Sequence, residues 1–140
     1  MKKFTLLLTM LLLSACSNPD LENTNDVTLR FWDGSEPAGN EEFIKDDGDI
    51  ETFVSATENA EVLEEGTVIN TPPLLKYSLR QDEENLDYHL WISEQGEGYI
   101  QSLISEGTRT YQLDEESVES LEDFLAGYDT VTFLNEVTFE

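Results

Sequence analysis

Few side chains in this sequence could carry out chemistry, and most of them stand in unspecific settings. The 140 residues include one cysteine, Cys16, one histidine, His89, and 31 aspartates and glutamates. Nucleophilic catalysis needs a nucleophile next to a base, and no serine lies in a Gly-x-Ser-x-Gly or comparable motif. His89 alternates with apolar residues of a predicted strand. The sequence therefore predicts no catalytic residue, no metal site and no cofactor.

The cysteine is the exception, because it ends the string Leu13-Ser14-Ala15-Cys16. A basic head at residues 2 and 3 and a mostly apolar run over residues 4–13 precede it. This order is typical of a secretory signal peptide covering residues 1–15. The last four residues resemble the lipobox of bacterial lipoproteins. The resemblance implies cleavage between Ala15 and Cys16, with an S-diacylglycerol and an N-acyl chain such as palmitate on Cys16.

Two alternatives exist for this segment. A transmembrane helix needs about 20 apolar residues, whereas the run over residues 4–15 has only 12. An ordinary signal peptidase would leave a secreted protein that starts with a cysteine by chance. Because two or more acyl chains hold a protein stably on a bilayer, we expect a lipid-anchored protein on the extracytoplasmic face of the cell membrane. With Cys16 acylated, no thiol is left for a disulfide, a metal or catalysis.

The acidic residues do not specify a site. Carboxylates are so numerous that pairs of them occur throughout the sequence. A pair suited to glycoside hydrolysis therefore cannot be recognised from the sequence. The run Asp46-Asp47-Gly48-Asp49 with Glu51 invites comparison with a calcium loop, but glycine and glutamate are missing from that loop's sixth and twelfth positions. A helix N-cap followed by acidic residues in the first turn explains the same letters.

The charge of the chain limits its partners. The formal net charge is −24, and removal of residues 1–15 leaves five basic and 31 acidic residues, or −26. Nucleic acid and anionic headgroups both need a basic surface, so neither is an expected partner. The acidity has two interpretations: it keeps a tethered monomer soluble in its habitat, which we favour, or it recruits cations or a basic partner. Hydrophobic residues make up 39% of the chain, enough for one folded domain.

Hydrophobic periodicity predicts one domain over residues 27–127, after a lipidated cysteine and flexible tether over residues 16–26. We expect strands at 27–32, 74–81, 86–93, 99–104 and 108–113, and a short extended piece at 43–44. Helices should start after Asp46 or Asp47 and after Asp114, and end near Asn59 and Gly127. Residues 128–140 are either an edge strand or an extended, frayed tail. The order predicts an α+β fold, a two-layer, mostly antiparallel sheet with two helices packed on one face.

One sheet face of the predicted domain carries unusual side chains. If Tyr77, Leu79, Tyr88, Leu90 and Ile92 face the helices, then Lys76, Arg80, His89 and Trp91 face the other way. Two of the five basic residues of the mature chain would then share this face with an aromatic ring. One hypothesis is that these four residues form a small recognition patch for an acidic or planar group of an envelope partner. The alternative, which we favour, is an ordinary solvated face where the cations form cross-strand ion pairs and Trp91 covers them.

Several motifs in the second half of the chain resemble the YhfM-like domain. They are Tyr88 to Glu94, the glycines Gly96 and Gly98, and Thr108 to Leu113 leading into a helix. The resemblance covers about residues 27–127. This chain departs from the pattern of the family in its double proline and its acidity. It implies a compact α+β domain of a small cell-surface lipoprotein from low-GC Gram-positive bacteria. It carries over no catalytic residues.

These observations favour a non-enzymatic accessory or binding lipoprotein whose partner is an unknown envelope protein or wall component. A carboxylate-based hydrolase of cell-wall polymer is the alternative. A solute-binding subunit of a transporter is disfavoured, because 125 mature residues form one lobe and not two.

Overall fold

The computed structural model describes residues 21–38, 41–103, 109–129 and 131–140. The predicted signal peptide, its predicted cleavage site between Ala15 and Cys16, and the connection between the strands expected at 99–104 and 108–113 lie outside the described residues.

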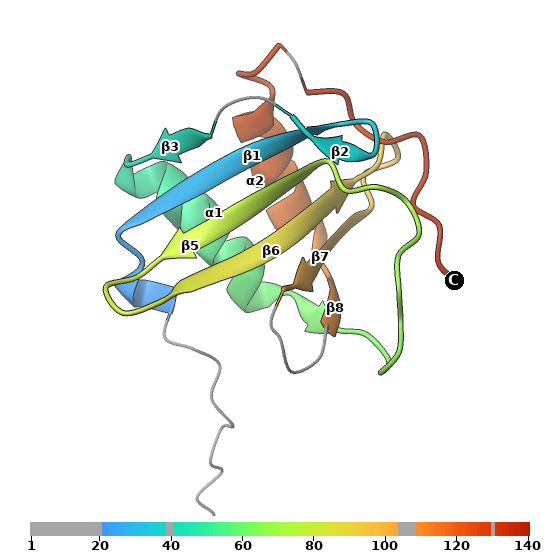
Figure 1. Cartoon of the computed structure of the whole chain (residues 1–140), viewed down its shortest axis with the longest axis horizontal. Coiled ribbons are helices and arrows are strands. Elements are labelled where there is room, and N and C mark those ends of the chain that lie inside the picture. The colour runs from blue at the N-terminus through green and yellow to red at the C-terminus, as the bar shows by residue number, and fades with distance from the viewer. Residues whose placement is uncertain (1–20, 39–40, 104–108, 130) are drawn as a thin grey trace, which may run out of the picture.

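The described residues form an antiparallel eight-stranded sheet with two helices on one face (Figure 1). The central strands are β1 (Asp26–Asp33), β5 (Leu75–Arg80), β6 (Asn85–Ile92), β7 (Gly98–Ser102) and β8 (Arg109–Gln112), paired in that order. The short strands β2 (Glu36–Pro37) and β3 (Glu42–Ile44) pair with β1, and β4 (Glu61–Val62) pairs with β8. The helices are α1 (Asp47–Asn59) and α2 (Glu115–Leu125). The predicted α+β, two-layer class is confirmed.

The main core lies between the helices and the sheet. Side chains alternate between the two faces of each strand, so every second strand residue points into this core. Val27 and Leu29 of β1, Leu79 of β5 and Leu90 of β6 are fully buried there. Against them pack Phe53 of α1 and the α2 residues Leu121 and Leu125. Phe31 of β1 and Phe124 of α2 are only partly buried at its margin. Tyr77 is buried with its hydroxyl 2.7 Å from Thr57 Oγ1, which ties α1 to β5.

Both helices begin at the predicted aspartates. Asp46 Oδ2 accepts a hydrogen bond from Asp49 N at 3.2 Å, and Asp114 Oδ1 accepts one from Ser117 N at 3.0 Å. The carboxylates thereby satisfy amides that have no partner inside the helix. The N-cap interpretation of the acidic run at residues 46–49 is confirmed.

The folded domain begins earlier than expected. A short 3₁₀ helix, η1 (Leu21–Asn23), precedes β1, and Leu21 is 5% exposed within the main core. Asn25 N donates to Arg80 O at 2.8 Å, next to the start of β1. Residues 21–26 are therefore part of the domain and not of the flexible tether, because the apolar side chain of Leu21 is buried.

The C-terminal segment, residues 131–140, packs beside the sheet without becoming a regular edge strand. Leu134 forms an isolated parallel bridge with Ser93, and Phe139 forms an antiparallel one with Ile69. Its side chains serve two clusters: Val131 and Phe133 pack on the main core, while Leu134 and Val137 pack on a second one. That second cluster consists of Ile69, Trp91 and Tyr99 on the face opposite the helices. In Figure 1 the segment runs along one end of the sheet.

Candidate functional site

The helix-free face of β1, β5 and β6 carries a row of basic side chains. The strand register pairs Arg30 with Lys76 and Lys76 with His89, so three strands place one such residue side by side. The next row pairs Thr28 with Ser78 and Ser78 with Asp87. Cross-strand neighbours on one face stand about 5 Å apart. Two of the five basic residues outside the predicted signal peptide thus meet here.

These rows form the floor of a hollow of about 270 Å³, which we call the donor hollow. It is lined by Thr28, Arg30, Trp32, Pro37, Glu41, Lys76, Ser78, His89 and Leu103. β1 supplies Thr28, Arg30 and Trp32, and the β2 region closes one side with Pro37. The tight turn between β1 and β2 uses Gly34 at φ 63°, a conformation that favours glycine.

The cations of the donor hollow are only loosely neutralised. Arg30 Nη2 lies 3.4 Å from Glu41 Oε1, and Lys76 Nζ lies 3.9 Å from Asp87 Oδ2. Asp87 is also held by the Ser78 hydroxyl, which donates to its other oxygen. The four charged side chains are 35–45% exposed. Exposed ion pairs of this kind contribute about 0–1 kcal/mol, so an incoming anion could displace them at small cost.

The surroundings of His89 favour the neutral form of its imidazole. Burial lowers its pKa from the usual 6.5, and the neighbouring positive charge of Lys76 lowers it further. The ring stands edge-on to Trp32 at 5.3 Å and to Trp91 at 5.9 Å between centroids. The imidazole therefore serves as a polar aromatic wall and not as a third cation.

Two polar groups at the donor hollow have no hydrogen-bond partner within the described parts of the chain. They are Thr28 Oγ1 and Trp32 Nε1, both shielded from solvent. Thr28 is 8% exposed. Buried polar groups in native proteins are nearly always paired, so unpaired groups at the wall of a hollow suggest a ligand atom.

The predicted recognition patch is therefore partly assembled. Lys76 and His89 line the donor hollow, whereas Arg80 pairs with Asp26 at 3.4 Å nearer the end of β5. Trp91 lies on the expected face but is only 2% exposed as a member of the second cluster, and its Nε1 donates to Thr71 O at 2.6 Å. A partner cannot reach it there.

Sequence reasoning missed Arg30 and Trp32. Both lie on β1, on the face opposite to that of the buried Leu29. The period-two pattern of residues 27–32 therefore did place them away from the helices. What the pattern could not show is that β1 pairs with β5 and not with another strand.

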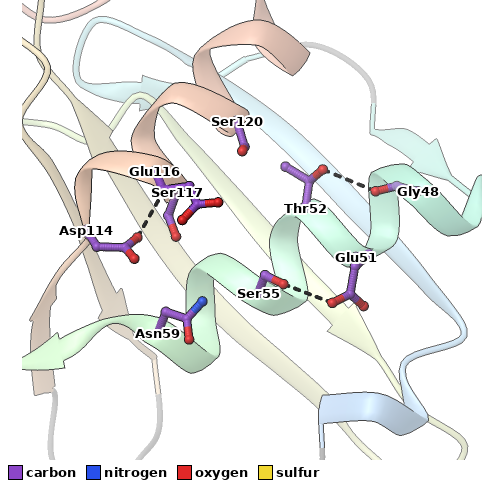
Figure 2. Close-up of a pocket in the computed structure, with 9 residues that line it drawn as sticks. All are labelled: Gly48, Glu51, Thr52, Ser55, Asn59, Asp114, Glu116, Ser117 and Ser120. Carbon is purple, nitrogen blue, oxygen red and sulfur yellow. Dashed lines mark hydrogen bonds between the residues drawn. The ribbon is translucent and has the colours of Figure 1, made fainter.

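A second hollow, of about 260 Å³, lies between α1 and α2 and is lined by residues of both helices (Figure 2). Its lining is small and polar: Gly48, Glu51, Thr52, Ser55, Asn59, Asp114, Glu116, Ser117 and Ser120. Several of these groups already bond within their own helix. Thr52 Oγ1 donates to Gly48 O, Ser55 Oγ donates to Glu51 Oε1, and Asp114 caps α2. The carboxylates of Glu51, Asp114 and Glu116 give this interhelical groove a negative lining, in contrast to the cations on the sheet face.

Among the described residues, His, Cys, Asp and Glu do not gather in threes in a way that could hold a metal ion. Within the same ranges, every helix is too short or too polar to span a bilayer.

Comparison with known proteins gives one match. A family model described as YhfM protein matches residues 23–129. No curated protein matches the sequence, and no solved structure matches the fold. The matched region begins within η1 and ends after α2, so it contains the whole helix–sheet core and the donor hollow.

Proposed function

The chain belongs to the YhfM family, and from this premise we propose that it is a non-enzymatic binding lipoprotein, anchored to the outer face of the cell membrane through Cys16. Its helix-free sheet face recognises an acidic group of an envelope partner, protein or wall component. The lipobox-like string at residues 13–16 supports the anchor.

The donor hollow carries this proposal. In a chain of net charge −24, random placement would surround each cation with carboxylates. Arg30 and Lys76 instead lie side by side across β1 and β5, with one loose carboxylate partner each. Two adjacent cations repel each other, and an arrangement that keeps them together is suited to a negative ligand.

The anchor is tested by replacing the thiol. Cys16→Ser removes the atom that would form the thioether, so the variant should incorporate no labelled fatty acid and should retain its signal peptide. The measurement is metabolic lipid labelling with membrane fractionation and intact mass, alongside the unchanged chain. Equal labelling, processed mass and membrane partition of both proteins would refute the anchor.

The recognition face is tested by charge reversal on intact cells. Crosslinking of the anchored protein should capture a partner, and Lys76→Glu should remove that partner. Arg80→Glu is the matched control, because Arg80 shares strand and face with Lys76 but does not line the donor hollow. If both variants capture the same partners as the unchanged protein, the recognition face is wrong.

The alternative, a hydrolase of wall polymer, has one observation in its favour. The interhelical groove brings Glu51, Asp114 and Glu116 to one hollow (Figure 2). We expect no soluble fragments when the protein is incubated with purified cell wall. Release of fragments that Glu116→Gln abolishes would establish the hydrolase instead.

A further inference from the structure

A third hollow adjoins the donor hollow around Trp32. It has a volume of about 330 Å³, and its wall combines apolar side chains with polar groups. The apolar side chains are Phe31, Pro72, Pro73, Leu74, Val131 and Leu134, and Asp33, Gly34 and Thr132 complete the wall. We call it the apolar hollow. Trp32 lines both, so the two share one indole as a common wall. Neither hollow involves the interhelical groove.

The wall of the apolar hollow is held by backbone hydrogen bonds from two distant segments. Trp32 N donates to Leu74 O at 3.1 Å, which fixes the loop that carries the two prolines. Leu134 N donates to Ile92 O at 3.0 Å, and Glu94 N donates to Leu134 O at 2.7 Å. The hollow is therefore a built feature in which the C-terminal segment forms one side.

The polar groups of the donor hollow favour a ligand that accepts hydrogen bonds. Arginine, lysine and the indole nitrogen can only donate, and a threonine hydroxyl can donate as well. The unpaired Trp32 Nε1 and Thr28 Oγ1 thus add two donors to the two cations. Because Glu41 and Asp87 remain close by, a single negative charge fits better than the double charge of a phosphate.

We propose that the donor hollow and the apolar hollow form one two-part site for a small carboxylate that carries an apolar group, about the size of an acylated amino acid. The carboxylate binds between Arg30 and Lys76, and the apolar group crosses Trp32 toward Pro73 and Leu74. Both volumes are at the lower limit for small-molecule sites, near 300 Å³. This inference rests on the proposed binding function and names its ligand class.

N-acetylleucine is the probe, titrated into the processed, acylated chain in detergent micelles. Two indole N–H signals report on the site by NMR. The Trp32 signal should shift, while that of Trp91, bonded to Thr71 O, should stay. N-acetylleucinamide lacks the charge and N-acetylglycine lacks the apolar group. Each should bind at least about tenfold more weakly than N-acetylleucine.

Three variants separate the site from its surroundings. Lys76→Gln and Thr28→Val should each weaken N-acetylleucine binding about tenfold, whereas Arg80→Gln should leave it within about twofold. Thr28→Val removes only the unpaired hydroxyl, so its thermal unfolding temperature should equal or exceed that of the unchanged protein. That measurement separates a lost ligand contact from a lost fold.

Three outcomes would overturn the inference. They are an unmoved Trp32 signal at saturating probe, equal binding of N-acetylglycine or of inorganic phosphate, and full affinity in Lys76→Gln. If crosslinking on cells still depends on Lys76 in such a case, the ligand class is wrong and the proposed function stands. If that dependence is absent too, both fail.

Discussion

Thr28 and Trp32 each leave a buried polar group without a partner, which costs about 1–3 kcal/mol per group. The core of the described residues also contains a buried polar group that is paired. Tyr77 is 1% exposed and shares a hydrogen bond with Thr57, and burial raises the pKa of its phenol. Tyr88, stacked on Tyr77, has its pKa raised to about 12, chiefly by burial. Among the described residues, two of the three buried side-chain atoms without a hydrogen-bond partner lie at the donor hollow, and the third is Asp26 Oδ1, which lies 3.4 Å from Arg80 Nε.

His89 gives a prediction at the same scale. Its pKa is lowered in the folded protein by burial and by Lys76, while the unfolded chain has the usual 6.5. Below about pH 6.5 the unfolded state binds more protons, so the free energy of unfolding should fall as the pH falls toward the lower folded value. His89→Gln should lose this dependence. Urea unfolding at about pH 7.5 and 5.5 measures it.

The comparison between the two proteins matters, because the many carboxylates also titrate in acid. Both proteins keep the charged side chains around the donor hollow, which are Arg30, Lys76, Glu41 and Asp87. Their contribution to the pH dependence of the free energy of unfolding therefore cancels when the two proteins are compared. Identical pH profiles for His89→Gln and the unchanged protein would show that the imidazole is not constrained as described.

Strand β7 packs tightly against helix α2 at Gly98. A Cβ there would lie 2.6 Å from Val118 Cγ2 and 2.9 Å from Leu113 Cδ1, both core side chains. Gly98→Ala should therefore lower the free energy of unfolding by about 1–3 kcal/mol, since α2 must move off the sheet. Chemical denaturation provides the measurement.

Two further variants show whether crowding is the cause. Gly127→Ala should be nearly neutral, because its Cβ would meet only Phe124 O at 3.5 Å, an ordinary contact. Val118→Ala combined with Gly98→Ala should recover part of the loss, since it removes the nearest methyl group. A double variant that is less stable than the sum of both single changes would contradict this account.

The elements with strong local signals could be predicted from the sequence. Asp46 and Asp114 sit before amphipathic helices, and alternation over β5 and β6 assigned both sheet faces. Strands β2 and β4 have two residues each, too few for any periodicity. The C-terminal segment gave a weak pattern because neighbouring residues such as Phe133 and Leu134 serve different clusters.

Part of the donor hollow could also be predicted from local sequence signals. Lys76 and His89 lie on strands joined by a short hairpin, so their pairing follows from local sequence. Arg30 and Trp32 come from a strand more than 40 residues earlier, and their position depends on a long-range pairing. Burial of Trp91 depends on the C-terminal segment, which no local pattern reveals.

Across the whole molecule, the C-terminal segment covers one end of the sheet face that the helices leave open. Removal of residues 131–140 should expose Trp91, which is 2% exposed, and uncover Ile69 and Tyr99. We expect tryptophan emission to shift to the red and the free energy of unfolding to fall by about 2 kcal/mol or more. Fluorescence-monitored denaturation records both quantities.

Phe139→Ala is the control for this truncation. Phe139 is 41% exposed and contacts Tyr99 edge-on at 5.2 Å, so its loss should cost about 0.5–1.5 kcal/mol without a spectral shift. A truncated chain with unchanged emission would mean that Trp91 is shielded by other segments.

The burial of Leu21 also limits how the proposed lipoprotein can stand on its membrane. Only four residues, 17–20, would separate the lipid-bearing Cys16 from this core side chain. Such a short tether reaches at most roughly 17 Å, so the lipid would hold the start of β1 close to the headgroups. The eight residues of β1 rise by about 26 Å, so the strand is long enough to carry Trp32 away from the bilayer.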